Sequence, residues 1–242
     1  MNGGVRMDKK RILLIGTCSS GSTALGRCFL QRSDTHVLSQ VIKDGVERNG
    51  DPNYSAFFKC QTTKPVIFNK EVFGWRTREL CTFRVLPDPV KFLPTNVVMI
   101  FLFRNPVAVW NGWVKRGWDL DIDLFFAAYE HLYAIFVSVS ELPQKSACGI
   151  TIFDRMRINP AEELQKICNL ADIQYEQEML DWQVAWGKRR GGNTGNPDID
   201  RHSTFAKDRV VPALIITQDV EKVIVKRLGN IWEEVNKIAP QQ

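Results

Sequence analysis

A loop of small and hydroxyl-bearing residues near the start of the chain has the composition of a phosphate-binding site. It runs from Gly16 to Thr23 with the sequence Gly-Thr-Cys-Ser-Ser-Gly-Ser-Thr, between an apolar run and a helix-like segment. Such a loop can turn backbone N–H groups toward an anion, and a following helix adds the partial positive charge of its N-terminus. The hydroxyl groups of Ser20, Ser22 and Thr23 are further donors. The segment predicts a phosphate site, and a simple Ser/Gly-rich turn is the alternative.

This loop lacks the lysine of an ATP-hydrolysing P-loop. Its spacing nearly follows the pattern G-x-x-x-x-G-K-[ST], but Ser22 occupies the position of the lysine. That lysine is the main point charge on the terminal phosphates of ATP. We therefore expect a loop that binds phosphate without hydrolysing ATP.

Two later segments carry cations that are suited to a phosphate. Arg104, in Phe-Arg-Asn-Pro, directly follows a strongly β-forming run, so its guanidinium would lie at the tip of a strand and could bind phosphate through two hydrogen bonds. The segment from Lys188 to Asn193 places three cations beside two glycines and could close over an anion. Each segment is also typical of a solvated surface, so neither indicates a site by itself.

Apolar runs and amphipathic segments predict the elements that position these residues. The expected strands are residues 11–16, 65–68, 97–103 and 149–153. The expected helices are residues 22–31, 107–116, 121–142, 160–170, 176–186 and 219–238. This alternation predicts an α/β fold of three layers, with a central, mainly parallel sheet flanked by helices. Ligands of such sheets bind beyond the carboxyl ends of the strands. The segments after Ile15, Phe68, Phe103 and Phe153 should therefore surround one cleft.

The composition is that of an ordinary globular protein. The chain has 242 residues, of which 44% are hydrophobic and 24% are charged, and its net charge is +5. We expect one domain over residues 1–242 with a flexible segment 1–10, as a monomer or homodimer. The small, dispersed positive charge argues against a nucleic-acid partner.

Neither a membrane nor a metal is expected from the sequence. The apolar runs fall far short of the roughly 20 residues of a spanning helix, and the polar first ten residues lack a signal-peptide core, which favours a cytoplasmic location. The six cysteines have neither C-x-x-C spacing nor a histidine at metal-ligand spacing. They are interpreted as reduced thiols.

Four segments, taken in order, resemble the sulfotransferases that use 3'-phosphoadenosine 5'-phosphosulfate. The run Ser19 to Thr23 is similar to the family's 5'-phosphate loop, and Arg104 to Pro106 resembles the start of its 3'-phosphate segment. Arg189 to Gly191 resembles a late element that also binds the 3'-phosphate. Phe153 to Met156 is similar to a stretch whose aromatic residue lies near the adenine. The resemblance extends from about Arg11 to the end of the chain.

This resemblance implies transfer of a sulfuryl group from the nucleotide to a hydroxyl or amine, leaving adenosine 3',5'-bisphosphate. The chain is short for the family, so we expect a small-molecule acceptor, such as a secondary metabolite. The residues implied to bind the nucleotide are Ser19, Ser20, Gly21, Ser22, Thr23, Arg104, Asn111, Gly112, Phe153, Arg189, Arg190 and Gly191.

The sequence departs from the family pattern at two positions. The basic residue of the 5'-phosphate loop is Ser19 here, and the serine expected eight residues after the arginine of R-N-P is Gly112. Lys70 or Arg27 could supply the missing charge, and Asn111 the missing hydrogen bond.

Sulfuryl transfer depends on positioning, charge stabilisation and a general base. Glu71 is the first candidate for the base, since a partly dry pocket after the strand 65–68 would raise its pKa. Lys70 would stabilise the bridging oxygen of the leaving group. Asp44 and His36 are alternative bases, and an exposed Lys–Glu pair is the interpretation without catalysis.

Tryptophans suggest where an acceptor could bind. Trp75 and Trp113 are predicted to contact it, because aromatic faces hold cationic or heteroaromatic molecules. A place in the core is the alternative for these rings. Two other functions stay open: a P-loop kinase for a nucleotide or small molecule, and a non-catalytic relative of the sulfotransferases.

Overall fold

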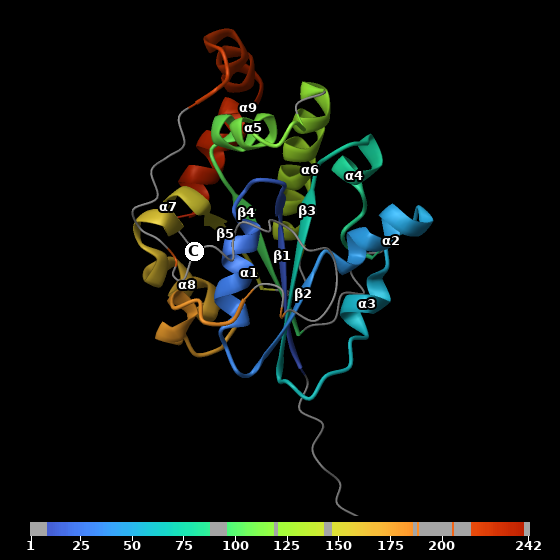
Figure 1. Ribbon diagram of the computed structural model, residues 1–242, viewed down its shortest axis with the longest axis vertical. Helices are drawn as coiled ribbons and strands as arrows, with labels where there is room; N and C mark the ends of the chain where they lie inside the picture. The colour runs from blue at the N-terminus through green and yellow to red at the C-terminus, as the bar shows by residue number, and fades with distance from the viewer. Residues whose placement is uncertain are drawn as a thin grey trace, which may run out of the picture.

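A parallel sheet with the strand order β2-β3-β1-β4-β5 lies at the centre of the molecule (Figure 1). The computed structural model describes residues 9–87, 96–118, 121–142, 147–185, 188, 205 and 214–239. The strands are β1 (Lys10–Thr17), β2 (Thr35–Ser39), β3 (Val66–Phe73), β4 (Val97–Phe103) and β5 (Cys148–Ile152). All four strand pairs within the sheet are parallel, which confirms the predicted α/β class.

Helices cover both faces of this sheet. They are α1 (Ser22–Leu30), α2 (Val41–Asn49), α3 (Tyr54–Phe58), α4 (Arg78–Thr82), α5 (Pro106–Val114), α6 (Ile122–Ser140), α7 (Phe153–Ile158), α8 (Pro160–Leu170), the 3₁₀ helix η2 (Gln177–Leu180) and α9 (Gln218–Ile238). Helices α1, α7, α8 and η2 pack on one face, and α2 to α6 together with α9 pack on the other.

Burial on both faces explains the apolar strand sequences. In β1, Ile12 and Leu14 belong to the core on the α1 side, whereas Leu13 and Ile15 belong to the core on the α6 side. Successive side chains of a strand point to opposite faces, so a central parallel strand must be apolar throughout. This is why β1 and β4 were predictable as short apolar runs.

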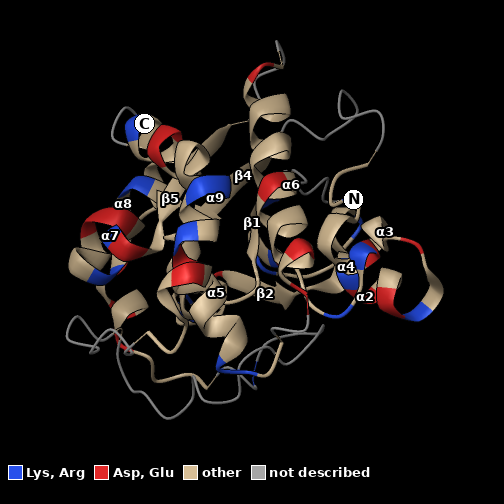
Figure 2. Cartoon of the chain, turned by 90° about the horizontal axis from the view of Figure 1, so that it is seen from above, with Lys and Arg blue, Asp and Glu red and all other residues tan. Residues whose placement is uncertain are grey.

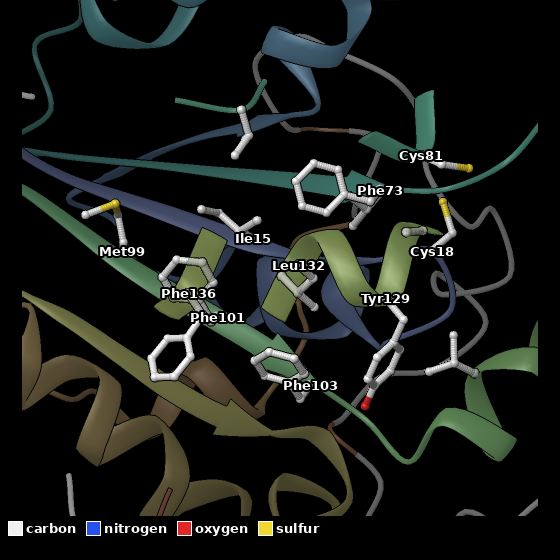
Figure 3. Close-up of a cluster of buried hydrophobic side chains, with 14 of the residues drawn as sticks. Ile15, Cys18, Phe73, Cys81, Met99, Phe101, Phe103, Tyr129, Leu132 and Phe136 are labelled. Atoms are coloured by element: carbon white, nitrogen blue, oxygen red, sulfur yellow. The ribbon is translucent and has the colours of Figure 1, made fainter. Parts of the chain in front are cut away.

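Helix α6 closes the larger of the two cores. Phe101 and Phe136 meet edge to face with 5.4 Å between ring centroids, and Ile15, Leu132 and Tyr129 pack beside them (Figure 3). By length and apolar composition, α6 is the one helix of the described segments that could also cross a membrane. Its packing on the sheet accounts for part of that composition, since 39% of the apolar window is buried.

Most predicted elements are confirmed, with ends within two residues of the expected positions. The second predicted strand is the main correction: it continues to Phe73, so Lys70 and Glu71 lie inside β3 and do not follow it. The predicted helix 176–186 is wrong, because only Gln177–Leu180 form a helical turn and residues 181–185 are not helical. Strand β2 and the helices α2, α3, α4 and α7 were not predicted.

Charges of both signs are interspersed over the described elements (Figure 2). The six cysteines are free thiols. Within the described ranges, no group of three or more His, Cys, Asp or Glu side chains could hold a metal ion.

Candidate functional site

The loop between β1 and α1 has a backbone that leaves donors open to a ligand. Ser19 (φ 69°) and Gly21 (φ 97°) are left-handed. The N–H of Ser20 donates to the Thr17 carbonyl at 3.2 Å, which closes the turn. In the part of the chain that is described, the N–H groups of Ser22 and Thr23 meet no acceptor, as expected for the first turn of a helix. These N–H groups form an anion-binding helix start.

Strand β3 and helix α5 each form a hydrogen bond with Cys18 of this loop. The N–H of Cys18 donates to the Phe73 carbonyl at 2.7 Å, and the indole Nε1 of Trp113 donates to the Cys18 carbonyl at 2.9 Å. Trp113 is only 1% exposed. Its ring also lies against Gly74, where an added Cβ would come within 2.4 Å of it. This geometry favours a supporting role for Trp113 over contact with an acceptor.

Phe153, the first residue after β5, lies directly on the loop. A Cβ added to Gly21 would come within 2.2 Å of the Phe153 ring. Only glycine therefore allows both the left-handed backbone and this close approach. The contact brings together two of the predicted nucleotide-binding residues from distant parts of the sequence.

We expect Gly21→Ala to destabilise the protein by about 2–4 kcal/mol, because it combines a left-handed alanine with a clash against a packed ring. Thermal unfolding measures this loss. Gly50→Ala is the matched control, since Gly50 is also left-handed (φ 78°) but a Cβ there meets nothing within 4 Å. Equal losses in the two variants would show that Phe153 does not rest on the loop.

Arg104, at the end of β4, reaches the same loop. Its Nη1 donates to the Ser19 carbonyl at 2.9 Å, and its guanidinium carbon lies 5.3 Å from the centroid of the Phe153 ring. Burial, and then the charges of Arg157 and Arg116, lower the pKa of Arg104 against the opposing effect of Asp154. The buried Nε finds no partner among the described residues. An orphaned guanidinium donor beside open N–H groups fits a phosphate oxygen.

The turn after Arg104 is locked in place. Asn105 Oδ1 accepts from the N–H of Val107 at 2.9 Å and so caps α5, while the Asn105 N–H donates to Asp154 Oδ2 at 3.0 Å. Tyr129 donates its hydroxyl to the Arg104 carbonyl at 2.9 Å. The ends of β1, β4 and β5 thus meet at one site, as the parallel-sheet rule predicts.

Two predicted ligands have side chains that are already engaged or enclosed. Ser20 is fully buried and lies against Gly16, where an added Cβ would be 2.9 Å from the Ser20 Oγ, so its hydroxyl is not presented at the surface. Asn111 Oδ1 accepts from the N–H of Ile215 at 2.9 Å. Arg189, Arg190 and Gly191 lie outside the described residues.

Arg27, one of the two suggested replacements for the loop's missing charge, is engaged elsewhere. Arg27 directs its guanidinium to the carbonyls of Trp182 and Val184, at 3.1 and 3.4 Å. Lys70 is 2% exposed within β3, paired in register with Leu14 of β1.

Glu71 is fully buried and accepts three hydrogen bonds. Its Oε1 receives the N–H of Ile42 and the Nδ2 of Asn69, both at 2.8 Å, and its Oε2 receives the N–H of Lys43 at 3.1 Å. Burial raises its pKa to about 7, against the effects of these bonds and of the Lys43 charge. Glu71 therefore caps the N-terminus of α2 from the neighbouring strand.

Lys43 extends this network toward the turn after β3. Its side chain is 2% exposed, and its Nζ donates to the Gly74 carbonyl at 2.8 Å. The alternative bases lie elsewhere: Asp44 forms a surface ion pair with Arg48 at 3.0 Å, and His36 lies within β2. Sequence reasoning missed Lys43, because a lone lysine in a polar segment gives no signal of burial.

An open aromatic surface lies beside the loop. The rings of Trp75 and Trp118 are tilted at 38° with 5.2 Å between centroids, and both residues are partly exposed. The Arg76 guanidinium lies 3.8 Å above Trp75, and that of Arg116 lies 5.3 Å from Trp118. Exposed aromatic faces suit a planar or cationic acceptor, and the contact of Trp75 with an acceptor stays a prediction.

No family model matches the sequence, and no curated protein does. Solved structures do resemble the fold. The sulfotransferase domain from the curacin biosynthetic pathway is 13% identical with a TM-score of 0.58, over 91% of this chain and 98% of that domain. The corresponding domain of the Synechococcus PCC 7002 olefin synthase is 13% identical with a TM-score of 0.58, over 93% and 97%.

Mouse sulfotransferase SULT7A1, complexed with PAP, is 14% identical with a TM-score of 0.58, over 98% of this chain and 90% of that chain. These likenesses extend over nearly the whole chain and share the sheet and flanking helices described above. They agree with the family that the four sequence segments resemble. This chain has the sulfotransferase fold.

Proposed function

We propose that this protein is a sulfotransferase that moves a sulfuryl group from 3'-phosphoadenosine 5'-phosphosulfate to a hydroxyl or amine of a small molecule. One observation carries the proposal: Arg104 and Phe153 both close on the loop from Ser19 to Thr23, at the carboxyl edge of a sulfotransferase-type sheet. That SULT7A1 is complexed with PAP on this fold supports the same ligand class here.

The residues present fit such a nucleotide. The open N–H groups of Ser22 and Thr23 would hold its 5'-phosphate end, and the unpartnered Nε of Arg104 would donate to its 3'-phosphate. The family resemblance would place the adenine near Phe153, whose ring is 9% exposed and packs on Gly21. The nucleotide supplies the activated sulfuryl group, and the protein supplies position and positive charge.

The acceptor must lose a proton as its new bond to sulfur forms and the bond from sulfur to the leaving phosphate oxygen breaks. Glu71 is the candidate to take that proton, since a pKa of about 7 is matched to this role. The products are then the sulfated acceptor and adenosine 3',5'-bisphosphate. Glu71 is fully buried, so an acceptor would reach it only if a side chain that covers it moves.

Adenosine 3',5'-bisphosphate should raise the melting temperature, and neither ADP nor ATP with Mg²⁺ should do so. A ligand at one hundred times its dissociation constant stabilises a protein by about 2.7 kcal/mol, which thermal unfolding detects. A shift only with ATP and Mg²⁺ would favour a kinase. No shift with the bisphosphate would contradict the proposed function.

A further inference from the structure

Arg116 contacts the loop between β1 and α1 from the turn that follows α5. It follows the end of α5, and its Nη1 donates both to Ser19 Oγ and to the Gly112 carbonyl, each at 2.9 Å. The residue is exposed, and its guanidinium lies 5.3 Å from the Trp118 ring. One nitrogen thus anchors the side chain at the loop, and the residue stays exposed to solvent.

This contact depends on the absence of a side chain at position 112. A Cβ at Gly112 would lie 2.8 Å from the Ser19 Cβ, 3.0 Å from its Oγ and 3.5 Å from Arg116 Nη1. Any larger residue there would push Ser19 away or displace the guanidinium. Ser19 and Gly112 therefore form a matched pair that makes room for Arg116.

Two guanidinium groups consequently meet on one residue of the loop. Arg104 binds the carbonyl of Ser19, and Arg116 binds its hydroxyl. The two charges repel, as the contribution of Arg116 to the lowered pKa of Arg104 indicates. Asp154 offsets the charge of Arg104, but no carboxylate of the described segments forms an ion pair with Arg116. Positive charge that no described carboxylate pairs with, next to open N–H groups, favours an anion between them.

We propose that Arg116 is a nucleotide-binding residue, whose guanidinium pairs with the oxygens at the 5'-phosphate end and supplies, from α5, the positive charge that the loop itself lacks. The inference rests on the proposed function. It assigns to Arg116 the charge that sequence reasoning sought in Lys70 or Arg27. Because the 5'-phosphate is the leaving group of the transfer, the same contact would stabilise its charge as the bond to sulfur breaks.

The test compares two ligands that differ only in the 5'-phosphate, adenosine 3',5'-bisphosphate and adenosine 3'-monophosphate, by isothermal titration calorimetry. Arg116→Ala should weaken binding of the bisphosphate about tenfold or more, since it removes a charge-assisted contact. Its affinity for the 3'-monophosphate should stay within about twofold of wild type. Arg116→Lys should recover part of the loss, because it restores the charge without the planar fork.

Lys115→Ala is the matched control, because it removes one positive charge from the adjacent exposed residue. It should leave both affinities within about twofold of wild type. Equal bisphosphate binding by wild type and Arg116→Ala would overturn the role of Arg116 and leave the proposed function standing. Equal weakening of both ligands would also overturn it, since the effect would not depend on the 5'-phosphate. A wild-type protein that binds neither ligand would overturn the proposed function and this inference together.

Discussion

Arg104→Ala should weaken binding of adenosine 3',5'-bisphosphate by more than tenfold. A guanidinium contact with a phosphate is worth about 1.5–3 kcal/mol, which corresponds to a factor of ten to more than one hundred. The buried, unpartnered Nε is the donor that would be lost. The variant also loses the hydrogen bond from Nη1 to the Ser19 carbonyl, so the loop itself becomes less ordered.

Isothermal titration calorimetry measures this loss, and the ligand pair used for Arg116 separates the two arginines. Arg104→Ala should weaken the binding of adenosine 3'-monophosphate as well as that of the bisphosphate, because both ligands carry the 3'-phosphate. Arg227→Ala is the control: Arg227 is an exposed arginine on α9 whose Nε donates to Glu130 at 2.6 Å. An unchanged affinity in Arg104→Ala would remove that residue from the site.

Glu71→Gln should lower turnover by roughly 10²–10⁴-fold while leaving the affinity for adenosine 3',5'-bisphosphate unchanged, if Glu71 takes the acceptor's proton. The base must be ionised, so wild-type turnover should rise with pH through about 7. The variant should lose this rise. Steady-state kinetics from pH 5 to 9, with calorimetric titration of the bisphosphate, measure both effects.

Glu71→Gln should also change how stability depends on pH. In the wild type, the free energy of unfolding falls with rising pH in the range where turnover rises. Burial raises the pKa of Glu71 from 4.5 to about 7, so the folded protein holds a proton that the unfolded chain has released between these values. The free energy of unfolding therefore falls as pH rises across this window, by on the order of 3 kcal/mol for this group. Glu71→Gln should remove that slope, which urea unfolding at several pH values measures.

Together, the two readouts separate a base from a helix cap. If Glu71→Gln loses the pH dependence of stability but keeps wild-type turnover, Glu71 only caps α2 and another residue is the base. Asp44→Asn is the control, because Asp44 lies in the first turn of the same helix but pairs with Arg48 at the surface. It should keep wild-type turnover, and a large loss there would make Asp44 the base.

Local chemistry made much of the site predictable. The loop from Gly16 to Thr23, the turn at Arg104 and the start of α7 at Phe153 each follow an apolar run that could only be a buried strand. Parallel strands bring their carboxyl ends to one edge, so these segments had to meet. Gly21 was a recognisable turn residue, although its contact with the Phe153 ring could not be read from its type.

The second strand shows where such reasoning stops. The polar types of Asn69, Lys70 and Glu71 predicted that the strand ends before them. In the structure, β3 continues through all three residues. The carboxylate is tolerated there because α2 presents its first N–H groups to it. Buried polar groups need partners, and those partners come from a segment about thirty residues away in sequence.

The sequence by itself determined the α/β class, the central apolar strands and the set of loops at their carboxyl ends. Each of these follows from the hydrophobic pattern of a short segment and from the common direction of parallel strands. Only the tertiary structure decided which cation reaches the Ser19 hydroxyl. Arg116 does so because α5 is rotated to place Gly112 against the loop, with no Cβ between them. That rotation is set by the packing of Trp113 against Gly74 and Cys18, a contact between distant segments that no spacing in the chain records.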